Sequence, residues 1–246
     1  GRHAPTAMGY EEAGQIDGGR TTHQILMDRV PGVLEADGYP DLAWYVRENL
    51  ATLKAGTIRA DRYTIDSGDH YMDPFAGQGL PGFRSAGEVA RGYARVARDS
   101  WAMGNHWNAL EALGRVLHLI QDLTVPHHAR LAPFDAHVEY EAWVTDHLAD
   151  LPGPTTGIYD IDGVSPEERT DPYPWIVAAG LASYSQFGLV DGSDGVDGND
   201  YGSAARDLVP LAIALSAGFV RRFLEASDSA PPGSRGRSAC PSDGER

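Results

Sequence analysis

Apolar residues recur at helical spacing over most of the chain. The first such segment begins near His23, and Thr21 and Thr22 are residue types that cap helices. Pro31 and Gly32 interrupt the apolar pattern. Because proline disrupts the interior of a helix, the pattern predicts that this first helix is short or kinked.

The same period continues in later segments, separated by two long stretches rich in Gly and Pro at about 55–84 and 150–170. No segment shows the alternation typical of a strand, and no internal repeat is present. The pattern predicts an all-α fold, a single multi-helix domain with long loops. The further helices are predicted at about 41–54, 85–100, 105–123, 134–149, 173–187 and 203–226.

The two ends differ from the middle in composition. Residues 1–20 are polar and Gly-rich and are predicted to form an arm; residues 228–246 are predicted to be a disordered tail. The helical domain is therefore expected at 21–227. The chain begins at Gly1 without an initiator Met. This start is typical of a processed secreted protein or of a trimmed chain, and we expect a secreted or periplasmic location with the signal peptide removed.

Composition and charge narrow the range of partners. Hydrophobic residues make up 42% of the 246-residue chain, enough for a sizeable core. No apolar run approaches the roughly 20 residues that span a bilayer, which indicates a soluble protein. The formal net charge of −15 disfavours tight binding to nucleic acid and to anionic lipid, because both are polyanions. We therefore expect no stable nucleic-acid partner and only transient contact with a membrane surface.

The residues that carry chemistry are His, Asp and Glu, since the chain has one cysteine. His118 and Asp122 lie four residues apart on a predicted helix, so they project from one side. Pro126 favours the end of that helix near Thr124, and His128 follows in the next turn.

A second pair, His137 and Glu141, has the same spacing on the next helix. Zinc binds imidazole nitrogen and carboxylate oxygen, and one carboxylate can bridge two ions. A single pair of this kind is more often a surface pair or a satisfied core group. Two pairs together, with a histidine after a Pro turn and an acidic loop containing His70, indicate a metal centre. The remaining His106 and His147 are expected at the surface or at helix ends, and His127 is expected to point away from the metals.

These motifs resemble the signature of the bacterial zinc-dependent phospholipase C family, which shares much of it with the S1/P1 nucleases. The resemblance rests first on His118-x-x-x-Asp122, on the Pro126-x-His128-Ala129 turn, and on His137-x-x-x-Glu141, which is the phospholipase version of the last pair. It also rests on upstream residues that resemble further family ligands: Thr22-His23, Ala60-Asp61 and His70-Tyr71-x-Asp73-Pro74.

The resemblance implies two or three zinc ions. One ion would take Asp61, His70, His118 and Asp122. A second would take His128, His137 and Glu141, with room for water. A third would take His23 and the second oxygen of Asp122, completed in the family by an N-terminal Trp. This chain departs there, because residue 1 is Gly and the first tryptophan is Trp44. Either the mature start lies upstream, or the third site is built differently or is weak.

The implied activity is hydrolysis of phospholipids to diacylglycerol and a phosphorylated headgroup, with the headgroup left open. Asp61 is either the general base or only a ligand. Three alternatives stay open: an S1/P1-type nuclease, a phosphoesterase for a small soluble ester, and a metal-stabilised helical protein without turnover. Glu141 in place of Asp argues against the nuclease, and three ligands at the second ion argue against a closed structural site.

Overall fold

Helices are the only regular structure in the part of the chain that the computed structural model describes, which is residues 21–61, 67–165, 168, 170–192 and 200–227. The predicted all-α class is therefore confirmed. The predicted arm at 1–20 and tail at 228–246 lie outside the described residues. The elements, in chain order, are α1 Thr22–Ala36, α2 Pro40–Glu48, α3 Leu50–Ala60, η1 Ser67–His70, α4 Ala86–Ala102, α5 His106–Asp122, α6 Pro126–Ala129, α7 His137–His147, α8 Pro172–Tyr184, η3 Phe187–Leu189 and α9 Tyr201–Ala226.

Helix α1 begins with a reciprocal cap. The Thr21 hydroxyl accepts from the Gln24 amide, and the Gln24 side chain accepts from the Thr21 amide. The helix runs through Pro31 to Ala36, so the prediction of a short helix is wrong. Its apolar face is buried, and tertiary packing of such a face outweighs the single hydrogen bond that a proline removes.

The segment predicted as one helix over about 41–54 forms two helices, α2 and α3, which meet at Asn49. The Asn49 side chain donates to the Tyr45 carbonyl at 2.9 Å, which is the local competition with backbone hydrogen bonds that interrupts helices. Helix α3 then continues to Ala60, six residues further than predicted (60 against 54). The predicted loop at 55–84 therefore begins only at Asp61.

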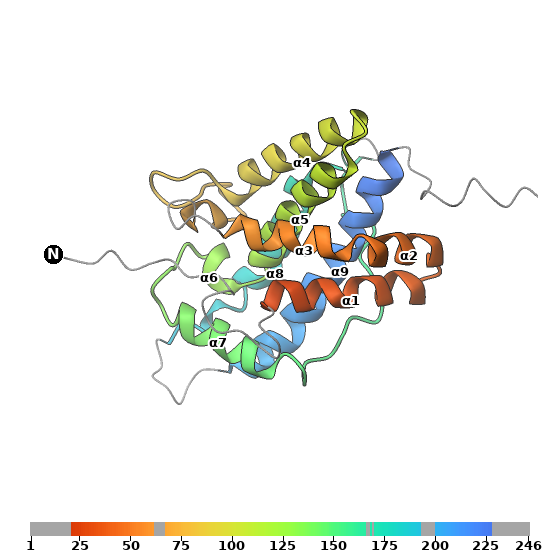
Figure 1. Cartoon of the computed structure of the whole chain (residues 1–246). Helices are drawn as coiled ribbons and strands as arrows, with labels where there is room; N and C mark the ends of the chain where they lie inside the picture. Colours follow the sequence, from red (N-terminus) through yellow and green to blue (C-terminus); the bar gives the residue numbers. More distant parts are fainter. Residues whose placement is uncertain (1–20, 62–66, 166–167, 169, 193–199, 228–246) are drawn as a thin grey trace, which may run out of the picture.

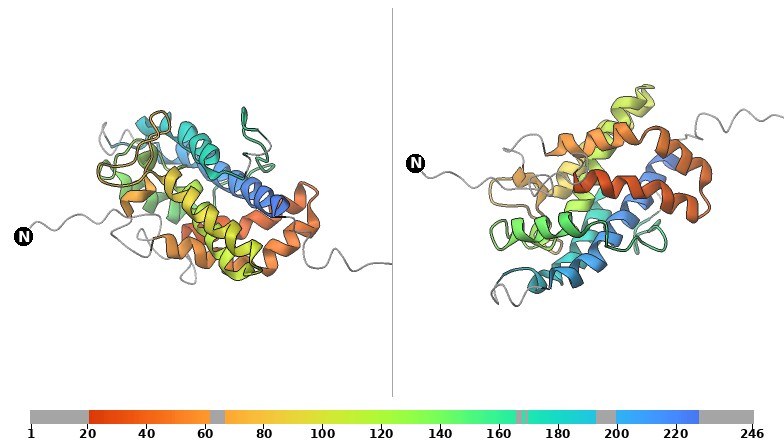
Figure 2. Two further views of the ribbon diagram at one scale, coloured as in Figure 1. Left: turned by 90° about the horizontal axis from the view of Figure 1, so that it is seen from above. Right: turned by 60° about the horizontal axis from the view of Figure 1, so that its bottom comes forward.

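Helix α5 lies at the centre of the bundle. It packs against α3 and α4 on one side and against α8 and α9 on the other (Figures 1 and 2). Nearly all of its residues from Ala109 to Asp122 are buried, as expected for a helix covered on every side. The carboxyl end of this central helix carries His118 and Asp122, two of the predicted metal ligands.

Two glycines let α3 and α5 touch. A Cβ atom on Gly56 would lie 2.1 Å from the Glu111 carbonyl oxygen, and one on Gly114 would lie 2.1 Å from that of Leu53. No side chain fits at either position, so the two backbones approach directly. Because α3 ends four residues after Gly56, this contact places Asp61 beside the last turns of α5.

Helix α9 is long and apolar enough to cross a membrane by length and composition, but 72% of its most apolar window is buried inside the structure. Its Phe219 ring packs edge-on against Trp175 of α8. Such burial is typical of a core helix in a globular protein.

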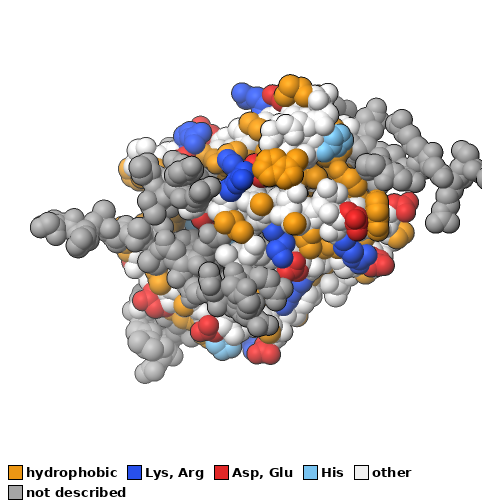
Figure 3. Space-filling model, viewed as in Figure 1, with side chains coloured by type: hydrophobic (Ala, Val, Ile, Leu, Met, Phe, Trp, Pro, Cys, Tyr) orange, Lys and Arg blue, Asp and Glu red, His pale blue; other side chains and the backbone are white. Residues whose placement is uncertain are grey.

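On the face shown in Figure 3, hydrophobic side chains are interspersed with basic and acidic ones.

Candidate metal centre

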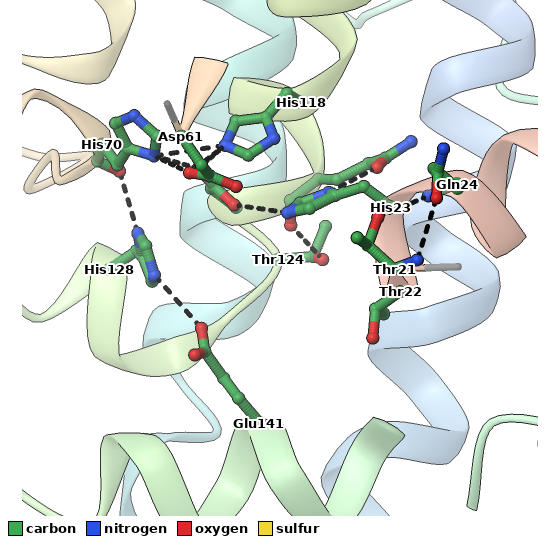
Figure 4. A network of polar contacts seen from close by, with 12 residues as sticks. Thr21, Thr22, His23, Gln24, Asp61, His70, His118, Thr124, His128 and Glu141 are labelled. Atoms are coloured by element: carbon green, nitrogen blue, oxygen red, sulfur yellow. Dashed lines mark hydrogen bonds and ion pairs between the residues drawn. The ribbon is translucent and has the colours of Figure 1, made fainter. Parts of the chain in front are cut away.

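The structure brings all eight predicted ligands into groups whose donor atoms lie within 4.8 Å of one another. They come from six places in the chain that meet around the end of α5 (Figure 4). His23 lies in the first turn of α1, Asp61 follows α3, His70 ends η1, His118 and Asp122 are on α5, His128 is on α6, and His137 and Glu141 are on α7.

The first cluster consists of Asp61, His70, His118 and Asp122. Asp122 Oδ2 lies 2.8 Å from His70 Nδ1 and 3.0 Å from His118 Nε2. Asp61 Oδ1 lies 3.4 Å and 3.1 Å from the same two nitrogens, which are 3.2 Å apart. Four donors at zinc distance in a tetrahedron would be roughly 3.3 Å apart, so this arrangement has the size of a zinc site.

The first cluster contains more acceptors than protons. Carboxylates only accept, and a neutral imidazole offers one N–H. Both carboxylates of this cluster direct one oxygen, Asp61 Oδ1 or Asp122 Oδ2, at the same two imidazole nitrogens in a largely buried place. Converging lone pairs in a buried place are stable when a cation is bound between them. The donor set therefore fits a zinc ion.

The pKa shifts agree with a site that attracts positive charge. Burial alone would raise the pKa of Asp122, but His118, His23 and His70 together hold the pKa well below its ordinary value. Burial would lower the pKa of His118, but Asp122 and Asp61 raise it well above its ordinary value. The carboxylates of the first cluster are therefore ionised at neutral pH, as metal ligands must be.

The second cluster consists of His128, His137 and Glu141. Glu141 Oε1 lies 2.9 Å from His137 Nε2 and 3.4 Å from His128 Nε2. Burial opposes ionisation of Glu141, but the two histidines hold its pKa below the ordinary value. Three protein ligands leave one tetrahedral position for another ligand, as in catalytic zinc sites.

Neighbouring groups set the orientation of both histidine rings in the second cluster. His128 Nδ1 donates to the His70 carbonyl at 3.0 Å, so its Nε2 presents a lone pair to Glu141. The Tyr71 ring stacks on the His128 ring with 4.4 Å between the ring centroids, and the Tyr71 hydroxyl lies 3.2 Å from His137 Nδ1. The supporting role of Tyr71 has no signal in the spacing of the sequence.

His23 faces the second oxygen of Asp122. Its Nε2 lies 3.3 Å from Asp122 Oδ1, while Asp122 Oδ2 faces the first cluster. The His23 and His118 rings are 4.0 Å apart, and His23 also groups with Asp61. The Asp122 carboxylate therefore lies between His23 on one side and His70 and His118 on the other. This is the position that the resemblance implied for a carboxylate shared by two ions.

Of the other histidines that the structure describes, His106 and His147 join no cluster, whereas the His127 ring stacks on that of His137 with 5.0 Å between the ring centroids. His127 Nε2 donates to the Asp135 carbonyl at 2.6 Å, and burial lowers its pKa to about 3. His106 and His147 are exposed and contact the rings of Trp101 and Trp143.

Two acids of the predicted loop have structural roles. Asp69 accepts hydrogen bonds from Arg84, and Asp73 accepts from two backbone amides in the following turn. Asp66 lies outside the described residues. Of the acidic side chains in this loop that the structure describes, only Asp61 joins a cluster.

Known proteins resemble this chain in sequence and in fold. No protein-family model matches it. A phospholipase C of Paraclostridium bifermentans is 26% identical over 253 aligned residues, which cover 89% of this chain and 63% of that protein. The chain therefore spans less than two thirds of the length of this curated relative.

Solved structures have the same fold. The alpha-toxin of Clostridium absonum matches with a TM-score of 0.69 at 19% identity, over 85% of this chain and 65% of that one. The alpha-toxin of an avian strain of Clostridium perfringens matches with a TM-score of 0.68 at 18% identity, over 87% and 65%. Sequence and fold together confirm the resemblance to the bacterial zinc-dependent phospholipase C family.

Proposed function

We propose that this chain is a zinc-dependent phospholipase C, which hydrolyses the phosphodiester bond of a phospholipid and yields diacylglycerol and a phosphorylated headgroup. The observation that carries the proposal is the pair of adjacent buried clusters of His and carboxylate donors. The relationship to a phospholipase C supplies the substrate class. Both clusters have the donor chemistry of zinc, so two ions are proposed there, with a third at His23 and Asp122.

The two clusters have different parts in the proposed site. Asp61, His70, His118 and Asp122 would hold one ion with four protein donors, and the second cluster would hold another with three. Zinc supplies charge stabilisation at the phosphate and an activated water at neutral pH. Because His128 donates to the backbone of His70, the two donor sets are held at a fixed separation.

Asp61 is the residue proposed to accept a proton from the attacking water. Burial raises the pKa of its carboxyl, but His118 and His70 lower it below the ordinary value, so the group is ionised at neutral pH. Its Oδ1 faces the first cluster, and its Oδ2 accepts no hydrogen bond from any residue that the structure describes. That oxygen is available for proton transfer, whereas both oxygens of Asp122 face histidines.

Exposed aromatic side chains on two of the segments that carry ligands support a lipid substrate. Phe75 and Phe134 are each 71% exposed. Phe75 follows His70 by five residues, and Phe134 precedes His137 by three. Apolar side chains on the segments that carry the ligands can contact the acyl region of a lipid surface briefly, in a protein whose net charge of −15 disfavours lasting attachment. The secreted or periplasmic location stays a prediction.

The test uses phosphatidylcholine vesicles and single-stranded DNA in parallel, each with and without a zinc chelator. We expect release of phosphocholine that the chelator abolishes, and intact DNA. His118→Gln should abolish the release, whereas His147→Gln, which alters an exposed histidine outside the clusters, should not. Chelator-sensitive loss of DNA with intact lipid would instead assign the protein to the nuclease branch, and turnover of neither substrate would contradict the proposed activity.

A further inference from the structure

A buried chain of hydrogen bonds connects α9 to His23 through the residue that precedes Asp122. Ser216 Oγ donates to the Ala212 carbonyl at 2.7 Å and accepts from Gln121 Nε2 at 3.1 Å. Gln121 Oε1 lies 2.7 Å from His23 Nδ1. The side chains of Ser216, Gln121 and His23 are all fully buried. The chain of bonds is therefore shielded from water.

The direction of these bonds determines where His23 carries its proton. The Ser216 hydrogen is used on Ala212, so Ser216 accepts from the Gln121 amide nitrogen, and the amide oxygen is turned to His23. An amide oxygen only accepts, so Nδ1 of His23 is the N–H. In a neutral ring this leaves the lone pair on Nε2, the atom that faces Asp122 Oδ1 at 3.3 Å.

We propose that Gln121 is a positioning residue that selects the ligand-competent tautomer of His23, and that Ser216 fixes the orientation of the Gln121 amide. The inference rests on the proposed zinc centre and concerns the ion between His23 and Asp122. Groups that hold the second ring nitrogen of a ligand histidine change metal affinity by roughly 10- to 100-fold when they are removed.

The opposite orientation of the amide would disfavour this ion. A flipped Gln121 would present its NH2 group to His23 Nδ1, which would then have to accept. The ring hydrogen would move to Nε2 and point at Asp122, where the ion is proposed. Successive residues of a helix point about 100° apart, so Gln121 can turn toward α1 and α9 while Asp122 turns toward the clusters.

The chain offers variants that separate positioning from packing. Gln121→Leu removes the acceptor at similar volume, and Gln121→Glu retains an acceptor for His23. Ser216→Ala removes only the group that orients the amide. Ser183→Ala is the matched control, because Ser183 is equally buried and donates to helix carbonyls, those of Leu123 and Gly180, with no bond to Gln121.

Zinc affinity is measured by competition with a chromophoric chelator, and the His23 tautomer by 15N NMR of the zinc-loaded protein. We expect Gln121→Leu to lower the affinity of one zinc ion roughly 10- to 100-fold and to leave the others unchanged. Gln121→Glu should restore that affinity. Ser216→Ala should lower the zinc affinity less than Gln121→Leu does, and Ser183→Ala should have the wild-type affinity. In the NMR spectrum of the wild type, His23 should show an Nδ1–H signal.

Equal zinc affinities in the wild type, Gln121→Leu and Ser216→Ala would overturn the inference, even if the wild type still releases phosphocholine. Equal losses in Gln121→Leu and Gln121→Glu, or a loss in Ser183→Ala, would also overturn it, because a merely structural role would explain them. A wild-type protein that binds no zinc would contradict the inference and the proposed function together.

Discussion

His128 donates its Nδ1 hydrogen to the backbone carbonyl of His70 at 3.0 Å, so a side chain of the second cluster is tied to the backbone of the first. The two residues are 58 positions apart in sequence. His70 also directs its own Nδ1 to Asp122 at 2.8 Å. Displacement of η1 would therefore disturb both clusters, and the two donor sets are expected to respond to mutation together.

Asp122→Asn should reduce activity and zinc content together, because the carboxylate faces His23 with one oxygen and the first cluster with the other. We expect loss of at least one zinc equivalent per chain and a fall of at least about 100-fold in phosphocholine release, measured on the same preparation by elemental analysis and by assay. Asp146→Asn, an exposed acid on α7, is the control. Full zinc content with full activity in Asp122→Asn would show that the carboxylate is not shared.

Gly114→Ala should destabilise the fold strongly, because its Cβ would lie 2.1 Å from the Leu53 carbonyl oxygen. Overpacking of this kind costs about 3 kcal/mol in the free energy of unfolding, measured by urea denaturation. Gly92→Ala is the matched control, since it lies on an exposed turn of α4 with no atom within 4 Å of the new Cβ. It should gain about 0.5–1 kcal/mol from helix propensity. Equal effects of the two changes would refute the close approach of α3 and α5.

Asp37 should make the stability of the fold depend on pH. Burial raises the pKa of its carboxyl, but hydrogen bonds from Gly157 at 2.7 Å and Tyr159 at 2.5 Å hold it below the ordinary value. A lowered pKa in the folded state adds stability above the unfolded pKa, and this stability is lost as the pH falls through the folded value.

The measurement compares unfolding of wild-type and Asp37→Ala protein, both metal-free, from pH 7 down to pH 3. We expect a difference of about 1 kcal/mol near neutral pH, because the partly exposed carboxylate is screened by solvent, and a smaller difference below about pH 4. Tyr159→Phe, which removes one of the hydrogen bonds to Asp37, should show a smaller effect of the same sign. A difference that does not change with pH would rule out the ionised carboxylate as its source.

Phe75→Ser and Phe134→Ser should slow the hydrolysis of vesicles more than that of a soluble short-chain phospholipid, because both side chains are 71% exposed beside ligand-bearing segments. We expect the apparent KM for vesicles to rise about 10-fold for the double variant, as roughly 1.4 kcal/mol of apolar contact is lost, with little change in kcat. Met103→Ser alters a side chain that is 76% exposed just beyond α4, beside the residues that begin α5, and it is the control. Equal losses on both substrates would point to damage at the site itself.

Local spacing in the sequence indicates the two pairs, His118 with Asp122 and His137 with Glu141, whereas His23 and Asp61 are implied only by the family resemblance. A separation of four positions between His118 and Asp122 places both on one side of a helix whatever surrounds it. The supporting residues depend on contacts between distant segments. The hydrogen bond between Gln121 and Ser216 joins α5 to α9, and nothing in the spacing of apolar residues along either helix indicates it.

The helix boundaries that differ from prediction also have tertiary causes. Gly56 weakens the helical signal after Lys54, but its lack of a side chain is what lets α3 lie against α5 and continue to Ala60. Pro31 is similarly tolerated within α1, where the buried apolar face holds the helix together. Packing thus overrides local propensity in both helices that lead to the site.

The central claim is tested most directly by adding zinc stepwise to metal-free protein while the bound zinc and the release of phosphocholine from vesicles are measured together. The account predicts no release from the metal-free protein, and a return of activity that follows occupancy and is complete at two or three zinc ions per chain. Full activity of the metal-free protein, or stoichiometric zinc binding that never restores hydrolysis of the lipid, would contradict it.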